Sequence, residues 1–174
     1  AAYTGICSKC SSTLKSLGAG TQRIEEEAAA LFPQARIARL DSDTAQNRKF
    51  GTQTIRDFSS GKIDILINNA GISMRASFKE VDLSVIRRLM DVNFWGTIYC
   101  TKFALPYLLE SKGSVTGVIS VAGYAGLPGR TGYATSKFAI RAFLETLRME
   151  HQEDGLHVMV FAPGYTESNV RNAA

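Results

Sequence analysis

The stretch Ile63-Asp64-Ile65-Leu66-Ile67-Asn68-Asn69-Ala70-Gly71 decides the fold that we predict for this chain. It opens with a short apolar run, interrupted only by Asp64, which is typical of a strand buried in a parallel sheet. The run ends in Asn68-Asn69-Ala70-Gly71, where polar and small residues replace the apolar ones. The pattern therefore predicts a buried strand from Ile63 to Ile67 with a polar loop at its carboxyl end.

Strands and helices alternate on both sides of this stretch. The predicted strands are Thr13 to Leu17, Ala35 to Leu40, Ile63 to Ile67, Val115 to Val121 and Leu156 to Phe161. The predicted helices are Gln22 to Phe32, Thr44 to Ser59, Leu83 to Glu110 and Gly132 to Glu153. We expect the third helix to bend or break near Asn93 and near Pro106. The alternation predicts an α/β fold: a doubly wound, Rossmann-like parallel sheet of four to five strands with helices on both faces.

Polar or turn-forming residues lie at the carboxyl ends of four of the predicted strands. These residues are Asp41, the Asn68 to Gly71 loop, Ser120 and Pro163-Gly164. Ligands of open parallel sheets bind at the carboxyl ends of the strands. The sequence therefore predicts one binding site, built from these four segments.

The stretch Tyr133-Ala134-Thr135-Ser136-Lys137 indicates what this site does. A tyrosine four residues before a lysine lies on the same face of a helix as that lysine. A nearby positive charge favours the ionised form of a phenol, which makes the tyrosine able to pass a proton. The hydroxyl of Ser120, at the end of the neighbouring strand, could bind a substrate oxygen. Together these residues predict proton transfer to or from a carbonyl or an alcohol.

From about residue 63 to residue 170 the chain resembles the short-chain dehydrogenase/reductase family. The matching segments are Asn68-Asn69-Ala70-Gly71, the asparagine of Asp91-Val92-Asn93, Ser120 thirteen residues before Tyr133, Tyr133-x-x-x-Lys137 and Pro163-Gly164. These five segments follow one another in the order that the family has. The resemblance implies a nicotinamide cofactor, NAD or NADP, and a small-molecule carbonyl or alcohol substrate.

The resemblance also implies four catalytic residues. Tyr133 is expected to be the general acid in reduction and the general base in oxidation. Lys137 would bind the nicotinamide ribose and favour the ionised phenol. Ser120 would donate a hydrogen bond to the substrate oxygen, and Asn93 would hold a water that relays protons to the lysine.

The same resemblance assigns cofactor contacts to loops at the sheet edge. Asn68, Ala70 and Gly71 would brace the sheet beside the cofactor, and Tyr133 and Lys137 would contact the cofactor itself. Pro163 and Gly164 would pass the nicotinamide, with Ser168 near its carboxamide. Asp41 matches an acidic position near the adenine, and Gly18 and Gly20 are the candidates for a phosphate-binding turn.

The chain departs from the family pattern at both ends. The family has three spaced glycines between its first strand and helix, whereas here only Gly18-Ala19-Gly20 occupies that place. One strand–helix unit before Asp41 has no counterpart. The substrate lid and the final strand that follow Pro163-Gly164 in the family have none either. We therefore expect an incomplete cofactor seat and a reduced or absent activity.

Residues 1–67 resemble a different family, the bacterial primosomal replication helicase. The segments that carry this resemblance are Cys7-x-x-Cys10, Leu17 to Glu27, Leu31-Phe32-Pro33, Ala35-Arg36-Ile37 and Asp41-Ser42-Asp43-Thr44. The resemblance implies a chimera, in which a helicase segment, 1–67, is joined to a dehydrogenase segment, 68–174, within one domain. Helicase activity is not expected because the chain has no Gly-x-x-x-x-Gly-Lys-Ser/Thr loop.

Composition narrows the classes of function further. The chain has 174 residues and 45% hydrophobic residues, which fits one domain with a sizeable core. The net charge of +4 is spread evenly: nine basic and seven acidic residues in 1–67, eleven and nine in 68–174. This even spread argues against nucleic-acid binding.

The cysteine content is also informative. Three cysteines argue against a disulfide framework. Cys7 and Cys10 make only half a zinc site, so no metal is expected. A cytoplasmic protein without a membrane span is the expectation.

Three functions remain open from the sequence. The first is an NAD(P)-dependent oxidoreductase that interconverts a carbonyl and an alcohol. The second is a folded but inactive chimeric scaffold. The third is a nucleic-acid-binding helicase fragment. In the short-chain family the helices around residues 83–110 and 132–153 often pair with a second subunit, so a homodimer is a further expectation.

Overall fold

The structure is a computed structural model that describes residues 25–26, 29–31, 33–34, 37 and 48–164. Residues 25–26 and 29–31 are helical, as predicted for Gln22 to Phe32. The predicted strand Thr13 to Leu17 lies outside the described residues. So does the strand Ala35 to Leu40, except for Ile37.

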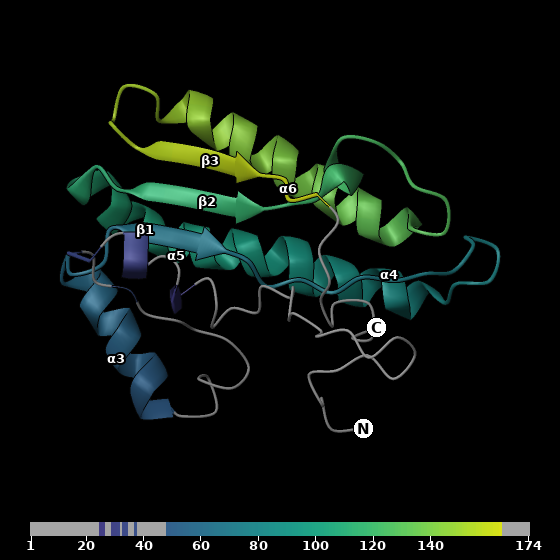
Figure 1. Cartoon of the computed structure of the whole chain (residues 1–174), viewed down its shortest axis with the longest axis horizontal. Coiled ribbons are helices and arrows are strands. Elements are labelled where there is room, and N and C mark those ends of the chain that lie inside the picture. Colours follow the sequence, from purple (N-terminus) through teal and green to yellow (C-terminus); the bar gives the residue numbers. More distant parts are fainter. Residues whose placement is uncertain (1–24, 27–28, 32, 35–36, 38–47, 165–174) are drawn as a thin grey trace, which may run out of the picture.

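Three parallel strands form the sheet of the described residues, in the order β1 (Ile65–Asn68), β2 (Ser114–Val118) and β3 (His157–Phe161). Figure 1 shows the three strands side by side, with α5 and α6 packed behind them. All three match predicted strands to within three residues at either end. The parallel pairing and the helical connections confirm the Rossmann-like class expected from the sequence.

The long helix before β2 consists of three parts. They are α4 (Leu83–Leu89), a π-helical segment η1 (Met90–Trp95) and α5 (Gly96–Ser111). The expected irregularity near Asn93 is therefore confirmed and takes the form of a π-helix, in which the Gly96 N–H donates to the Asp91 carbonyl. The helix does not break at Pro106, since α5 continues through this residue to Ser111, so of the two expected forms only a bend is compatible with the structure.

Two further helices complete the described fold. Helix α3 (Arg48–Ser59) packs beside α5, where the rings of Phe58 and Tyr107 meet edge to face at 6.2 Å. Helix α6 (Thr131–Glu150) ends three residues before the predicted Glu153, and a turn leads to Gly155, whose φ is +79°. No helix of the described residues combines the length and the apolar character that a membrane-spanning segment needs.

The hydrophobic core lies between one face of the sheet and the helices α5 and α6. Its buried members are Ala104, Leu108, Val115, Ile119, Ile140, Leu144, Leu147, Leu156 and Val158. Helix α6 packs tightly against the sheet at Gly117 in β2, where a Cβ would overlap the Leu144 side chain. The helix that carries Tyr133 and Lys137 is therefore packed on β2 and β3.

The opposite face of the sheet differs from the prediction of a strand buried on both sides. Ile65 and Ile67 of β1 are 48% and 44% exposed, and Met159 and Phe161 of β3 are half exposed. In parallel pairing, alternate residues point to the same face, so these four side chains share one face. The prediction was wrong for this face. An apolar run indicates a strand, but whether a face of the strand is buried depends on the elements that pack against it, and α5 and α6 pack on the other face.

Candidate functional site

Lys137 is the buried centre of the candidate site. Its side chain projects from α6 and is only 4% exposed, and Nζ donates a hydrogen bond of 2.9 Å to the Val118 carbonyl at the end of β2. Burial lowers the pKa of Lys137 to about 8, because the charged ammonium loses hydration. Val118 O is the only acceptor that the described residues give to Nζ, so further N–H groups remain for a ligand.

Tyr133 lies one helical turn before Lys137, as its spacing predicted. Lys137 Nζ is 5.9 Å from the centre of the half-buried Tyr133 ring, and the Arg130 guanidinium carbon is also 5.9 Å from it. Two cationic side chains therefore border one phenol. This arrangement provides a proton donor in a positively charged setting.

Ser120 follows β2 and begins the short 3₁₀ helix η2 (Val121–Gly123). Its Oγ accepts a hydrogen bond of 3.2 Å from the Ala122 N–H, which fixes the start of this turn. A Cβ on Gly123 would lie 3.2 Å from the Lys137 carbonyl oxygen, so η2 packs directly on α6 at the lysine. The structure thus brings the Ser120 turn and the Tyr133–Lys137 helix together.

Asn93 lies in the π-helical segment and is completely buried. Its Oδ1 accepts from the Ile72 N–H at 2.8 Å, and its Nδ2 donates to the Ile72 carbonyl at 3.0 Å and to Ser136 Oγ at 2.9 Å. Both amide hydrogens are used within the protein. Holding a water, the role that the resemblance implies for Asn93, remains a prediction.

The loop after β1 is attached to several elements. Asn68 Nδ2 donates to Thr101 Oγ1 in α5 at 3.0 Å. Gly71 lies beside the site, since a Cβ there would be 3.3 Å from Lys137 Nζ and 3.4 Å from Asn93 Oδ1. Further along, Arg130 donates to Ser73 Oγ, and the Ala76 N–H donates to the Gly129 carbonyl at 3.1 Å. The last two bonds hold the loop to the residues around the start of α6.

Of the remaining predicted site residues, some belong to the described part of the chain and others do not. Pro163 and Gly164 follow β3 at the carboxyl edge of the sheet, as expected. Gly18, Gly20, Asp41 and Ser168 lie outside the described residues, as do Cys7 and Cys10. Within the described part of the chain, no group of three metal-ligand side chains comes together.

Sequence reasoning gave no role to Ser73, Arg130 or Ser136, although all three join the site. Ser136 stands inside the motif Tyr133 to Lys137, and its position three residues after the tyrosine could have indicated a contact inside one helical turn. No local pattern points to the pairing of Ser73 with Arg130, because 57 residues separate them.

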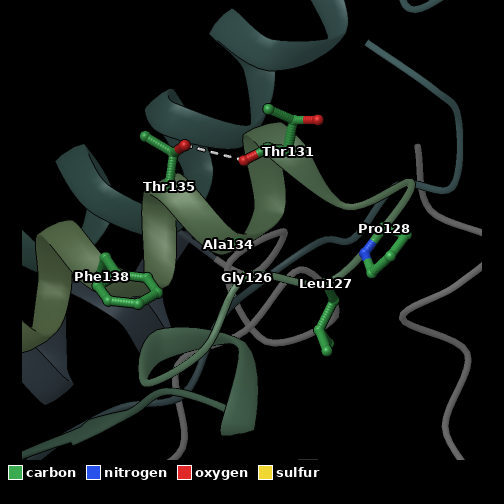
Figure 2. Close-up of a pocket in the computed structure, with 7 residues that line it drawn as sticks. All are labelled: Gly126, Leu127, Pro128, Thr131, Ala134, Thr135 and Phe138. Carbon is green, nitrogen blue, oxygen red and sulfur yellow. Dashed lines mark hydrogen bonds between the residues drawn. The ribbon is translucent and has the colours of Figure 1, made fainter.

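A pocket between the loop 126–128 and the first turns of α6 does not include the two central residues of this site. Its lining consists of Gly126, Leu127, Pro128, Thr131, Ala134, Thr135 and Phe138, and includes neither Tyr133 nor Lys137. Figure 2 shows the apolar side chains of Leu127, Pro128 and Phe138 around it, and the hydrogen bond of 2.9 Å from Thr135 Oγ1 to the Thr131 carbonyl.

The low pKa of Lys137 predicts a pH-dependent stability. Below about pH 8 Lys137 is charged in both states, and the burial of its ammonium lowers the free energy of unfolding. Between about pH 8 and pH 10.5 the folded protein has lost this proton while the unfolded chain still holds it, so the free energy of unfolding rises with pH. Relative to Lys137→Met, the wild type should gain about 1–3 kcal/mol in free energy of unfolding from pH 7 to pH 10. Urea unfolding of both proteins at the two pH values measures this, and an unchanged difference would contradict the burial of a charged amine.

The chain is similar to known proteins over most of its length. The family model described as "short chain dehydrogenase" matches residues 4–174. The 11-beta-hydroxysteroid dehydrogenase A of Sesamum indicum is 38% identical over 152 residues, which cover 86% of this chain and 43% of that protein. The chain thus spans less than half the length of this relative.

Solved structures give the same similarity. A short-chain dehydrogenase from Burkholderia cenocepacia in complex with NADP is 30% identical, with a TM-score of 0.61, over 71% of this chain and 53% of that one. An NADH-dependent reductase complexed with NAD is 29% identical, with a TM-score of 0.59, over 70% of this chain and 53% of that one.

These comparisons correct one expectation from the sequence. The family match begins at residue 4 and runs through the segment 1–67 that was assigned to a helicase. The helicase resemblance and the chimera therefore receive no support, and the nucleic-acid alternative loses its basis. With the Rossmann-like sheet, the Tyr133–Lys137 helix and this match together, the chain belongs to the short-chain dehydrogenase/reductase family.

Proposed function

We propose that this chain is part of an NAD(P)-dependent oxidoreductase that interconverts a small-molecule carbonyl and an alcohol. The observation that carries the proposal is the buried Lys137 ammonium, with the Tyr133 ring on one side and the Cβ-free Gly71 on another. A buried cation without a carboxylate partner among the described residues is unusual in a structural role. A buried ammonium of this kind is suited to binding a polar ligand beside a proton donor, here Tyr133.

Each of the four proposed catalytic residues has a distinct part in this reaction. Tyr133 gives its proton to the carbonyl oxygen in reduction and takes it back in oxidation. Ser120 donates a hydrogen bond to the same oxygen as negative charge develops there. Lys137 places its Nζ 5.9 Å from the centre of the Tyr133 ring and would bind the ribose of the cofactor. Asn93 holds the loop after β1 in place through Ile72, and its proposed catalytic part is to hold a water that relays protons to Lys137.

The described residues fit a nicotinamide cofactor. Lys137 has spare N–H donors for ribose hydroxyl groups, and the missing side chain of Gly71 leaves space next to them. Asn68, Ala70, Pro163 and Gly164 are proposed to line the same edge of the sheet, and Gly18, Gly20, Asp41 and Ser168 to extend the seat. When bound, the cofactor would supply the hydride. Both NADP and NAD remain candidates, since structural relatives carry either one.

Cofactor titration tests the proposal. We expect millimolar NADPH or NADH to raise the melting temperature of the chain, because a ligand that binds only the folded state stabilises it. A saturating increase with either cofactor, reduced in Lys137→Met, would support the function. Cooperative melting with no shift at millimolar concentration would instead favour the alternative, an inactive α/β scaffold.

We also propose that the protein forms a homodimer through α5. Trp95, the last residue of η1, and Tyr99 and Phe103 of α5 recur every four residues and are 44%, 57% and 76% exposed. The rings of Trp95 and Tyr99 stack at 5.6 Å, so they form a continuous apolar surface. Sedimentation equilibrium should therefore give twice the monomer mass, and the monomer mass after Phe103→Lys. A monomeric wild type would exclude this interface.

The predicted substrate and location remain open to direct tests. A panel of small ketones and secondary alcohols, assayed through the absorbance of the reduced nicotinamide, would define the substrate. A cytoplasmic location stays a prediction, which fractionation of cells that express the protein would check.

A further inference from the structure

Ser136 occupies an unusual place in the site. It is completely buried, and its hydroxyl group makes two hydrogen bonds. It donates to the Tyr133 carbonyl at 2.8 Å, within its own helical turn, and accepts from Asn93 Nδ2 at 2.9 Å across to the π-helical segment. A serine inside a helix can bond back to a carbonyl of the preceding turn. Here the same hydroxyl also receives a donor from another element.

The bonds of Ser136 and Asn93 form one continuous chain. It runs from both backbone groups of Ile72, through the Asn93 amide and the Ser136 hydroxyl, to the backbone of Tyr133. Asn93 has no amide hydrogen left over, and Ile72 directly follows Gly71 beside Lys137. Buried networks in which every hydrogen is used act cooperatively, because freeing one member leaves another unsatisfied.

We propose that Ser136 is a positioning residue that couples the Ile72 loop to the helical turn of Tyr133. Through this link, the loop that borders the proposed cofactor seat sets the position of the proton donor. This rests on the proposed function for its catalytic consequence, but the coupling itself is a property of the folded chain. Ser136 touches neither substrate nor cofactor in this role; it acts through Asn93 and Tyr133.

Replacing Ser136 with alanine tests the coupling in two ways. In Ser136→Ala the second Asn93 Nδ2 hydrogen has no acceptor, so the amide is free to leave Ile72. Hydrogen exchange of the Ile72 amide, followed by NMR, should speed up about tenfold. For ketone reduction, kcat should fall about tenfold while KM for the ketone changes less than about twofold, because binding is retained and only the proton donor is misplaced.

Two further variants serve as controls. Thr146→Ala removes a hydroxyl that bonds back to the Ala142 carbonyl in the same helix, away from Asn93, and should leave both readouts unchanged. Ser136→Cys keeps a weak donor and acceptor at nearly the same size and should give intermediate values. If Ser136→Ala does not fold, Ser136→Cys still tests whether Ser136 couples Ile72 to the helical turn of Tyr133.

The outcomes separate this inference from the proposed function. Unchanged exchange at Ile72 in both Ser136 variants would overturn the coupling, whatever the activity. Faster exchange with unchanged kcat in an active enzyme would overturn the positioning role. A wild type without cofactor binding or turnover would instead refute the proposed function, and the exchange at Ile72 would still decide whether the coupling exists.

Discussion

Tyr133→Phe should abolish most of the ketone reduction, lowering kcat by about 10²–10⁴-fold. The substitution removes only the phenolic hydroxyl and keeps the ring that lies 5.9 Å from Lys137 Nζ and from the Arg130 guanidinium. Since the ring fills the same space, the fold and the cofactor seat should persist. Steady-state rates with a small ketone and excess NADPH or NADH measure the loss.

Two companion measurements make this result specific. The increase in melting temperature with cofactor should remain in Tyr133→Phe, which shows that the chemistry and not the fold was lost. Tyr107→Phe is the matched control, because Tyr107 contacts Phe58 on the far side of α5 and should keep the wild-type rate. A Tyr133→Phe enzyme with a rate near that of the wild type would refute the assignment of Tyr133 as proton donor.

Gly117→Ala should destabilise the protein by about 1–3 kcal/mol, and Leu144→Ala by about 2–5 kcal/mol. A Cβ on Gly117 would overlap Leu144 Cδ1, and Leu144 is completely buried, so its side chain has nowhere to move without strain. Leu144→Ala acts differently, since it leaves a cavity between β2 and α6. Urea unfolding of each variant gives the two free energies.

The double variant distinguishes this steric reason from a general weakening of the sheet. In Gly117→Ala with Leu144→Ala, the new methyl group occupies part of the cavity, so the loss should be at least about 1 kcal/mol smaller than the sum of the single losses. Gly126→Ala is a matched control, because an added Cβ there meets no atom within 4 Å. Strict additivity of the two core substitutions would contradict the close packing of α6 on Gly117.

Much of the fold could be predicted because its signals are local. The apolar runs at residues 63–67, 115–121 and 156–161 indicated three strands, and a helix irregularity was expected near Asn93; the structure has each of them. A break at Pro106 does not occur, because a proline lacks one N–H but packing can hold a helix together around it. The exposed face of Ile65 and Ile67 was also missed, since burial depends on which elements cover a strand.

The sequence by itself determined the parallel α/β class, and it identified Tyr133, Lys137, Ser120 and Asn93 as the candidate site. The class depends on periodicity and the Tyr133–Lys137 pair on spacing within one helix, which a chain carries with it before it folds, whereas Asn93 was identified by the family resemblance and Ser120 by its place at a strand end together with that resemblance. Only the tertiary structure decided which groups these residues bind: Val118 for Lys137, and Ile72 and Ser136 for Asn93. The physical reason is that these partners come from different elements, up to 43 residues apart, and only the packing of the π-helical segment and α6 brings them within hydrogen-bonding distance.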